Sequence, residues 1–436
     1  MSDQIRFIVQ PGGMLRGKIR IPGDKSISHR AIIFGAIAEG LTIITGFLEG
    51  EDALATLNAF RLMGVNIDGP EQGRVSISGV GMRGLSSPDQ PLNLGNSGTS
   101  MRLLSGLLSG QQFDSVLVGD ASLSKRPMTR IIKPLTKMAV DIRATEAGTA
   151  PLKIRGGSVL KGITYEMPMA SAQVKSCLLL AGLYGEGKTC VIEPAPTRDH
   201  TERMLESFGY PVERVGNRVS IVGGERLIAT DLDIPGDISS AAFFMVGATI
   251  AADSEIVLEH VGLNPTRAGV IEILRLMGAK LVVENQRTIG GEPVADIRVQ
   301  SSQLKGITIP AHLVPLAIDE FPALFIAAAC AEGQTLLTGA EELRVKESDR
   351  IQVMADGLKN VGIDANPTAD GICIQGGKIL GGTVNSSGDH RIAMAFAIAG
   401  LIAETSIEIL DCKNVDTSFP GFLEISSRMG LGISGQ

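Results

Sequence analysis

The chain is poor in the aromatic residues that nucleic-acid-binding surfaces use. It contains no tryptophan and only 3 tyrosines among 436 residues. Proteins that bind single strands stack the bases on aromatic side chains, and a phosphate backbone requires a basic face. Because the formal net charge is −7, the composition excludes a typical nucleic-acid-binding protein, and we expect no nucleic-acid partner.

Cysteines are also few, and the chain lacks long uninterrupted apolar runs. The five cysteines are scattered and form no Cys-x-x-Cys pair, which argues against a disulfide framework or a zinc site and indicates a reducing compartment. Residues 1–10 lack the basic-then-apolar pattern of a signal peptide. Glycines or charges interrupt each apolar segment before about 18 residues, the length needed to span a membrane. We therefore expect a cytoplasmic protein with no membrane partner and no metal.

What the chain does contain is one unit repeated six times, at intervals of about 70 residues. Each copy opens with polar residues of the kinds that cap helices and continues into an apolar segment, which indicates a helix buried on all sides. A helix N-terminus carries unpaired N–H groups and favours anions. The six openings are Asp24-Lys25-Ser26, Gly95-Asn96-Ser97-Gly98, Ala170-Ser171-Ala172-Gln173, Gly236-Asp237-Ile238-Ser239, Asp319-Glu320 and Ser387-Gly388-Asp389.

A second recurring feature is an amphipathic helix that ends in Met-Gly or a relative and is followed by short strands, so each unit is predicted to be β-α-β-α-β-β. Glycine is the expected C-cap; one copy has Ala139 there, and its cap should be less regular. The predicted buried helices are 31–38, 101–108, 177–183, 241–248, 325–331 and 392–402.

The two halves of the chain match each other, because Ile21-Pro22-Gly23-Asp24 recurs as Ile234-Pro235-Gly236-Asp237. A chain of 436 residues is too long for one ordinary core. We predict two α/β domains with three units each. One comprises residues 22–235, the other residues 1–21 together with 236–436, and the hinges lie near 22–24 and 235–237.

Basic residues gather at or near several of these helix starts. In the first half they are Lys25 and Arg30 around the first helix, Arg102 after Gly98, and Lys125-Arg126 before Pro127. Simple helix capping with solvated charges explains each motif about as well as anion binding does. Their accumulation in an acidic protein favours anion binding.

In the second half, cations alternate with carboxylates. Lys346 and Arg350 are four residues apart and are predicted to share a helical face, where an anion or a carboxylate must separate them. Asp319 is interpreted either as an N-cap or as a general base held ionised by cations. Asp389 is a candidate partner for Arg391, which precedes a purely apolar run.

These segments together resemble the family of 3-phosphoshikimate 1-carboxyvinyltransferases (EPSP synthases), essentially from end to end. The resemblance is carried by Gly23-Asp24-Lys25-Ser26, Gly95-Asn96-x-Gly98-Thr99, Arg126-Pro127-Met128, Leu343-Arg344-x-Lys346-Glu347-Ser348-Asp349-Arg350 and Asp389-His390-Arg391. It implies a two-domain inverse α/β barrel, in which buried helices point to an interdomain cleft. It also implies a monomer that needs no cofactor.

The resemblance further implies transfer of the enolpyruvyl group of phosphoenolpyruvate to the 5-hydroxyl of shikimate 3-phosphate, with release of phosphate, in the shikimate pathway. Asp319 is similar to the family's general base and Glu347 to its general acid, and Lys25 is the third catalytic candidate. The implied ligands of shikimate 3-phosphate are Lys25, Ser26, Arg30, Ser171, Gln173, Asp319 and Lys346. Those of phosphoenolpyruvate are Lys25, Gly98, Arg126, Gln173, Arg350 and Arg391.

Two positions depart from many family members: Ala172 replaces a second serine, and Ser418 replaces a lysine before Phe419-Pro420. Ser418 suggests the subgroup often called class II, whose members tolerate glyphosate. That tolerance is associated with alanine at the position of Gly98, so the two features point in opposite directions on herbicide sensitivity.

Two alternatives stay open at this point. A sister enzyme with the same fold transfers enolpyruvyl to UDP-N-acetylglucosamine and uses a loop cysteine as acid; no cysteine here lies in a polar loop of the second unit. A non-catalytic anion-binding protein on the same scaffold would need the basic residues without Asp319 and Glu347 in reach of one substrate.

Overall fold

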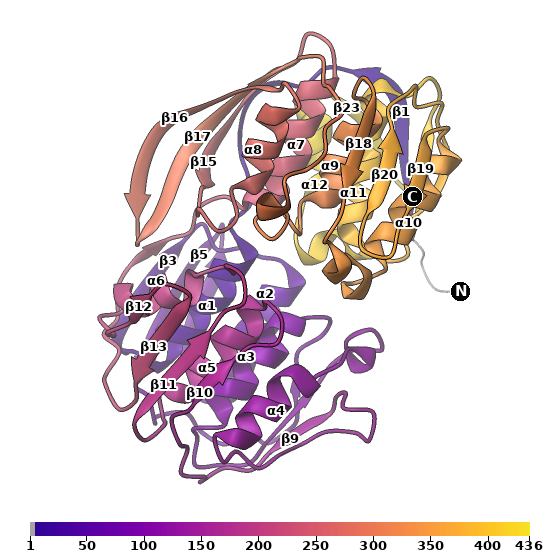
Figure 1. Cartoon of the computed structure of the whole chain (residues 1–436). Coiled ribbons are helices and arrows are strands. Elements are labelled where there is room, and N and C mark those ends of the chain that lie inside the picture. The colour runs from indigo at the N-terminus through magenta and orange to yellow at the C-terminus, as the bar shows by residue number, and fades with distance from the viewer. Residues whose placement is uncertain (1–4) are drawn as a thin grey trace. The chain divides into compact units, whose positions relative to one another are not determined.

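The computed structural model describes residues 5–436 (Figure 1). The chain forms two compact units. The C-terminal unit comprises the described part of Met1–Pro22 together with Pro235–Arg287 and Pro293–Gln436. The N-terminal unit comprises Gly23–Ile234 and the short segment Thr288–Glu292. The first four residues of the predicted segment 1–21 lie outside the described part.

These boundaries differ from the prediction at three places. Pro22 and Pro235 belong to the C-terminal unit rather than to the N-terminal one. Thr288–Glu292, the turn between two long strands, belongs to the N-terminal unit although the chain on either side does not. The hinges near 22–24 and 235–237 stay a prediction.

The N-terminal unit contains three four-stranded sheets with one common pattern. In each sheet the first two strands pair in parallel, and the remaining neighbours pair antiparallel. The orders are β14 (Leu232–Asp233), β3 (Glu39–Thr45), β5 (Arg74–Val80), β4 (Asn66–Glu71); β6 (Leu92–Asn93), β7 (Ser115–Val118), β9 (Leu152–Ile154), β8 (Ile142–Arg143); and β10 (Thr164–Glu166), β11 (Lys188–Ile192), β13 (Arg218–Val222), β12 (Glu213–Val215).

The C-terminal unit repeats the pattern with two sheets of four strands and one of three. The orders are β16 (Lys280–Ile289), β17 (Glu292–Gln300), β15 (Glu255–Gly262), β2 (Arg16–Arg20); β18 (Gln334–Leu337), β20 (Ile372–Gln375), β19 (Asp364–Pro367); and β21 (Gly382–Asn385), β22 (Ile407–Leu410), β1 (Phe7–Gly13), β23 (Leu431–Gly435). Beside β18, only an isolated parallel bridge from Thr308 to Leu336 replaces the fourth strand.

The start of the chain completes the C-terminal unit, as the sequence suggested. Strand β1 pairs with β22 and β23, and β2 pairs in parallel with β15. Within the N-terminal unit, β14 lies at the end of the segment Gly23–Ile234 and pairs in parallel with β3 near the start of that segment.

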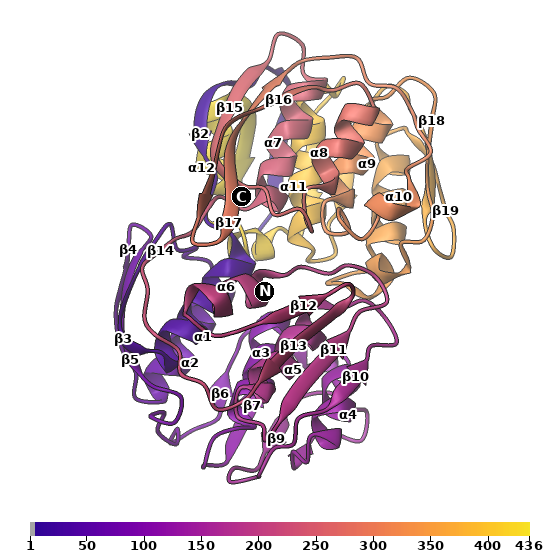
Figure 2. The ribbon, with the colours of Figure 1, turned by 60° about the vertical axis from the view of Figure 1, so that its left-hand side comes forward.

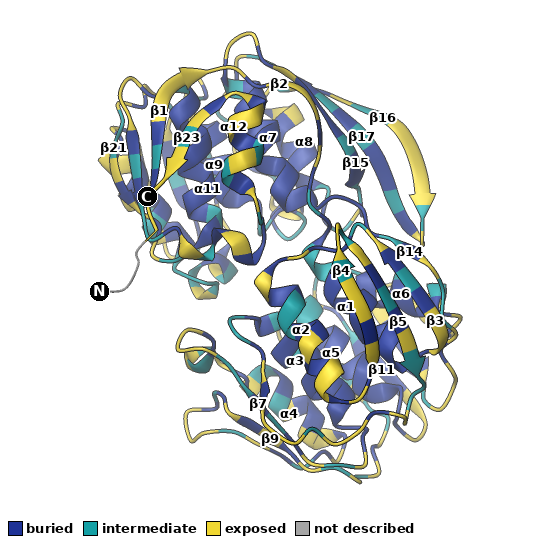
Figure 3. Cartoon of the chain, turned by 180° about the vertical axis from the view of Figure 1, so that it is seen from behind, coloured by how far each residue is buried: buried dark blue, intermediate teal, exposed yellow. Residues whose placement is uncertain are grey.

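Buried helices fill the interior of each unit, which is the inverse arrangement expected for the fold. In the C-terminal unit α7, α9 and α11 pack on one another among the strands (Figure 2). Figure 3 shows these helices as buried along their length, whereas the outer helices expose one face. The inner helices are α1 (Lys25–Ile37), α3 (Gly98–Leu108), α5 (Ala172–Gly182), α7 (Ile238–Ile250), α9 (Phe321–Ala329) and α11 (His390–Ala399).

Each inner helix begins earlier than predicted, because the residues just before the predicted apolar segment are helical too. A second, outer helix follows in every unit: α2 (Glu51–Leu62), α4 (Thr129–Lys137), α6 (His200–Ser207), α8 (Gly269–Leu276), α10 (Arg350–Asn360) and α12 (Phe422–Met429). Short 3-10 turns connect some elements: η1 (Leu123–Lys125), η2 (Ala311–Leu313), η3 (Glu341–Val345), η4 (Gly400–Ile402) and η5 (Lys413–Thr417).

Two small residues show how closely these elements approach. A Cβ atom on Gly106 of α3 would lie 2.0 Å from the carbonyl oxygen of Cys177 on α5, so only glycine permits this helix contact. Ala139, predicted to give a less regular cap, has φ 71° and thus adopts the left-handed conformation of the glycines at the equivalent positions. The prediction was wrong, because the backbone keeps its path at a cost of about 1 kcal/mol.

The structure also bears on two compositional predictions. All five cysteines are free. In residues 5–436, no helix combines the length and the apolar character needed to cross a membrane.

Candidate active site

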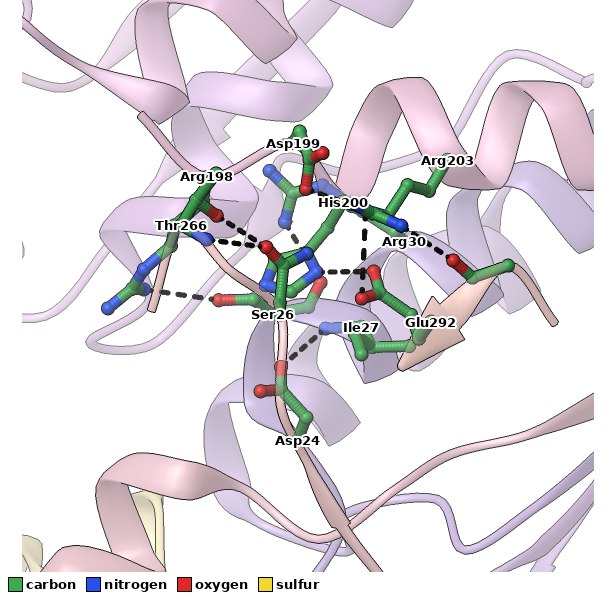
Figure 4. A network of polar contacts seen from close by, with 12 residues as sticks. Asp24, Ser26, Ile27, Arg30, Arg198, Asp199, His200, Arg203, Thr266 and Glu292 are labelled. Carbon is green, nitrogen blue, oxygen red and sulfur yellow. Dashed lines mark hydrogen bonds and ion pairs between the residues drawn. The ribbon is translucent and has the colours of Figure 1, made fainter. Parts of the chain in front are cut away.

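In the N-terminal unit, the first turn of α1 presents Lys25 and Ser26. Asp24 caps the helix, because its carboxylate accepts a hydrogen bond of 2.9 Å from the backbone N–H of Ile27 (Figure 4). Lys25 forms an ion pair with Asp52 at the start of α2. Arg198 donates a hydrogen bond of 3.4 Å to the Ser26 hydroxyl. The predicted ligands thus lie on a well-anchored helix start.

Arg30 lies one turn further along α1 and is only 3% exposed. Its Nε donates to the Thr201 hydroxyl at 2.7 Å, and one terminal nitrogen donates to the Ser176 hydroxyl, also at 2.7 Å. The other terminal nitrogen donates to the Ser26 carbonyl at 2.9 Å. Burial lowers the pKa of Arg30 to about 10, so the guanidinium stays charged near neutral pH.

The start of α3 brings two further guanidinium groups around Gly98. Ser97 caps this helix. A Cβ atom added to Gly98 would lie 2.9 Å from a terminal nitrogen of Arg102 and 3.3 Å from one of Arg126. Arg126 also donates to the Asn96 side-chain oxygen at 2.7 Å. The glycine therefore leaves the backbone open beside two cations, as an anion site requires.

Gln173 connects this group to α5. Its side-chain oxygen accepts a hydrogen bond of 2.6 Å from Arg102, and its nitrogen donates to the Thr99 hydroxyl at 3.0 Å. Ser171 caps α5 by accepting a hydrogen bond of 3.4 Å from the backbone N–H of Val174. The capping interpretation of Ser171 is thus confirmed, and its side chain lies at the same end of the helix as Gln173.

In the C-terminal unit, Asp319 lies between two cations. One of its carboxylate oxygens is 3.3 Å from Lys346 Nζ and 3.4 Å from a terminal nitrogen of Arg350. A carboxylate thus separates the two like charges, as their proximity demanded. Burial opposes the charge on Lys346, but Asp319 and Glu342 outweigh it and raise the pKa of this lysine.

Two local predictions about these residues were wrong. Glu320, rather than Asp319, occupies the N-cap position of α9. Lys346 and Arg350 do not share a helical face, because η3 ends at Val345 and α10 begins only at Arg350. Asp349 starts α10 by accepting a hydrogen bond of 3.0 Å from the backbone N–H of Gln352.

Arg350 is 1% exposed and is surrounded by carboxylates. Its Nε lies 2.8 Å from Asp389, and a terminal nitrogen lies 2.7 Å from Glu347. Burial disfavours the charge, but Asp389, Glu347 and Asp319 outweigh it and raise the pKa of Arg350. Burial likewise opposes ionisation of Asp389, yet Arg350 brings its pKa below the usual 3.8. The sequence had suggested Arg391 as the ion-pair partner of Asp389. In the structure this partner is Arg350.

Arg391 completes the group of this unit. Its guanidinium donates a hydrogen bond of 3.1 Å to the backbone carbonyl of Asp319. The structure therefore brings together the residues predicted for this half of the chain: Asp319, Lys346, Glu347, Arg350 and Arg391. In the part of the chain that the structure describes, no group of three or more His, Cys, Asp or Glu residues is placed to hold a metal.

The chain is similar to known proteins over nearly its whole length. The family model of EPSP synthase (3-phosphoshikimate 1-carboxyvinyltransferase) matches residues 9–425. A curated 3-phosphoshikimate 1-carboxyvinyltransferase from Nitrosococcus oceani is 67% identical over 432 residues, covering 99% of this chain and 97% of the relative. One from Methylococcus capsulatus is 66% identical over 434 residues, covering 99% of both chains. The chain belongs to the EPSP synthase family.

A solved EPSP synthase from Acinetobacter baumannii has the same fold as this chain. The TM-score is 0.91 at 62% identity, and the match covers 99% of this chain and 100% of the solved one. The two-domain α/β architecture predicted from the resemblance to EPSP synthases is therefore confirmed.

Two arginines in this EPSP synthase family member lie among the candidate residues but were not assigned to either substrate from the sequence. Arg102 contacts Gln173, and Arg198 contacts Ser26. Arg102 stands in the glycine-rich motif, four residues after Gly98, so helical spacing was a usable signal. Arg198 precedes the outer helix α6, and none of the motifs at the starts of the buried helices includes it.

Proposed function

We propose that this chain transfers the enolpyruvyl group of phosphoenolpyruvate to the 5-hydroxyl of shikimate 3-phosphate, as a 3-phosphoshikimate 1-carboxyvinyltransferase of the shikimate pathway. One observation carries the proposal beyond family membership. Asp319 is held by Lys346 and Arg350 at 3.3 and 3.4 Å, and Glu347 lies on the same Arg350 at 2.7 Å. Two carboxylates ordered by one guanidinium suit a reaction that removes one proton and adds another.

Shikimate 3-phosphate carries a phosphate and a carboxylate, and we propose seven residues as its ligands. They are Lys25, Ser26, Arg30, Ser171, Gln173, Asp319 and Lys346. The geometry of Arg30 supports the assignment: a guanidinium has five N–H donors, and three of these bond to Thr201, Ser176 and the Ser26 carbonyl. One N–H remains on each terminal nitrogen, a pair that suits the end-on, two-point binding of a carboxylate.

Phosphoenolpyruvate also brings a phosphate and a carboxylate. We assign it to Lys25, Gly98, Arg126, Gln173, Arg350 and Arg391. The opening at Gly98 beside Arg126 supports this assignment, because a backbone without a side chain lets an anion reach both the N–H groups of the helix start and the guanidinium. Gln173 bridges Arg102 and Thr99 beside the same turn.

The reaction then proceeds by addition and elimination. Asp319 removes the proton from the 5-hydroxyl, whose oxygen attacks C2 of phosphoenolpyruvate, while Glu347 delivers a proton to the methylene carbon. The resulting tetrahedral intermediate loses phosphate and a proton from the new methyl group, which restores the double bond. Lys346 and Arg350 keep Asp319 ionised as a base, and Lys25 stabilises the negative charge of the phosphates.

The positions of the cysteines do not support the sister reaction on UDP-N-acetylglucosamine. Its acid would be a loop cysteine, whereas three of the cysteines here lie in secondary-structure elements, Cys177 in α5, Cys190 in β11 and Cys373 in β20. Cys330 directly follows α9, and Cys412 is buried with its thiol donating to the carbonyl of Ile409. We also propose that the enzyme acts as a monomer in the cytoplasm, which sedimentation of the purified chain and fractionation of cells would test.

The proposal is tested by removing the acid and the base separately. Asp319→Asn and Glu347→Gln should each lower kcat for phosphate release by about 10²-fold to 10⁴-fold, because each removes one proton-transfer group. The midpoint of urea unfolding is measured in parallel to show that each variant is folded. Wild-type turnover in either folded variant would remove that residue from the mechanism. Lack of phosphate release by the wild-type chain with both substrates would favour an anion-binding protein instead.

A further inference from the structure

A lysine that is not among the residues assigned above to substrates is completely buried in the N-terminal unit. Lys175 on α5 is 1% exposed, and its ammonium lies 2.7 Å from Glu202 on α6 and 3.0 Å from Glu193, which follows β11. Glu202 is equally buried. A lysine buried to this extent needs such partners, since an unpaired charge in the interior is costly.

This ion-pair group lies directly beside the hydroxyls that hold Arg30. Ser176 follows Lys175 on α5, and Thr201 precedes Glu202 on α6. The two hydroxyls are 2.7 Å apart, and both accept hydrogen bonds from Arg30. The helices α5 and α6 are therefore linked twice at the same level, once by the buried ion pair and once by the hydroxyl pair.

We propose that Lys175 is a positioning residue for the binding of shikimate 3-phosphate: by pairing with Glu202 it prevents this buried carboxylate from neutralising Arg30, so that the guanidinium oriented by Ser176 and Thr201 stays available to a substrate anion. The inference rests on the proposed role of Arg30 as a ligand of that substrate.

The electrostatic part of this role follows from the surroundings of Arg30. Among the described residues, Arg30 has no carboxylate within ion-pair distance. Glu202 is nonetheless the carboxylate whose charge acts most strongly on it. Without Lys175, no ammonium would offset the charge of Glu202, and this charge would satisfy the Arg30 guanidinium inside the protein in place of a substrate anion.

The second carboxylate extends the same arrangement towards Ser26. Glu193 accepts a hydrogen bond from the Thr197 hydroxyl and is thus fixed from both sides. Arg198 follows Thr197 and donates to the hydroxyl of Ser26. Lys175 therefore supports two cations, Arg30 and Arg198, that approach the first turn of α1. None of these links touches Gly98 or Arg126, which are assigned to phosphoenolpyruvate.

The test is a pair of variants and their combination, assayed by steady-state phosphate release with each substrate varied in turn. Lys175→Met should raise KM for shikimate 3-phosphate by about 10-fold to 100-fold, the effect of losing one charge-assisted hydrogen bond, and leave KM for phosphoenolpyruvate within about threefold. Glu202→Gln should leave both KM values within about threefold, since Lys175 keeps Glu193. Combining the two should restore KM for shikimate 3-phosphate to within about threefold of wild type.

The combination separates the proposal from a role in packing alone. If Lys175 only held the helices together, the double variant would bind shikimate 3-phosphate as poorly as Lys175→Met or worse, and that result would overturn the proposal. If Lys175→Met does not fold, Glu202→Gln and the double variant test the proposal. A tenfold rise in KM for shikimate 3-phosphate in either of them would overturn the proposal.

Two further variants make the result unambiguous. Lys188→Met is the matched control, because Lys188 pairs with Glu213 in the same unit but is about half exposed, and both KM values should stay at the wild-type level. Arg30→Met tests the underlying assignment. If Arg30→Met raises KM for shikimate 3-phosphate and Lys175→Met does not, the positioning role is wrong and the proposed function stands. If neither changes it, the assignment of Arg30 is itself wrong.

Discussion

Arg30 and Arg350 are both buried arginines, one in each unit, and their surroundings are opposite. Arg30 bonds to two hydroxyls and one carbonyl. Arg350 bonds to three carboxylates, those of Asp389, Glu347 and Asp319. Burial lowers the pKa of Arg30, whereas the three carboxylates raise that of Arg350 despite burial. Neutral partners orient Arg30 without neutralising it, while Arg350 is neutralised within the fold.

This difference suggests distinct roles for Arg30 and Arg350, which the sequence motifs alone do not distinguish. Four of the five N–H donors of Arg350 are engaged, two by Asp389 and one each by Glu347 and Asp319, so one remains for the proposed contact with phosphoenolpyruvate. Its main effect is to hold the proposed base and acid in one arrangement. Arg30 keeps two donors and its full charge, which suits the binding of a substrate anion.

The largest expected effect comes from removing Arg350. Arg350→Met leaves three carboxylates near one another without their common cation, and breaking such a buried group should lower the free energy of unfolding by about 3–5 kcal/mol. Urea denaturation of the full chain measures the loss. Arg344→Met is the matched control, because Arg344 pairs with Asp349 at a more exposed position and should cost less than about 1 kcal/mol. Equal losses of unfolding free energy in the two variants would contradict the claim that the three carboxylates depend on the charge of Arg350.

A smaller effect, with a defined pH dependence, is expected for Asp389→Asn. The amide retains hydrogen-bonding atoms but not the charge, so the free energy of unfolding should fall by about 2 kcal/mol at neutral pH. Because Arg350 lowers the pKa of Asp389 below 3.8, the stabilisation by the carboxylate is fully present above that value. It is lost as the pH falls through the lower, folded-state pKa. The stability difference from wild type should therefore shrink in acid; a difference that grows in acid would contradict this assignment.

The smallest effect is expected from one neutral partner of Arg30. Thr201→Val removes the hydroxyl that accepts from Nε but keeps the shape of the side chain. Since the Ser176 hydroxyl and the Ser26 carbonyl remain, we expect KM for shikimate 3-phosphate to rise about fivefold, corresponding to about 1 kcal/mol. Steady-state assays with varied shikimate 3-phosphate measure this, and a rise above about 100-fold would show that Thr201 does more than orient the guanidinium.

N-cap residues made the starts of the inner helices predictable, but the start of the outer helix α10 was not predicted. Asp24, Ser171 and Asp389 each cap an inner helix at the place the sequence indicated. The Lys346–Arg350 pair was misread because Asp349, an equally clear N-cap, starts the helix after Lys346. Lys346 and Arg350 still both contact Asp319, because this contact depends on the positions of their charged groups and not on helical spacing.

Other features depend on contacts between distant segments and have no local signal. The turn Thr288–Glu292 belongs to the N-terminal unit through contacts such as the 2.6 Å hydrogen bond between His200 and Glu292 (Figure 4). The buried helix was predicted only for residues 177–183, so Lys175 lay outside it. A buried charge becomes recognisable only when its partners, Glu193 and Glu202, are brought to it by folding.

We propose that the charge of Arg30, which no carboxylate within residues 5–436 pairs with, is available to bind a substrate anion. The most direct test is the dissociation constant of shikimate 3-phosphate, measured by titration calorimetry with wild type, Arg30→Lys and Arg30→Met. Arg30→Met should bind the substrate about 10-fold to 100-fold more weakly. Arg30→Lys should lie between the two, because an ammonium keeps the charge but not the paired donors. The urea unfolding midpoint of Arg30→Met should change much less than that of Arg350→Met. Unchanged affinity in a folded Arg30→Met chain would contradict the claim that this charge is kept for the substrate.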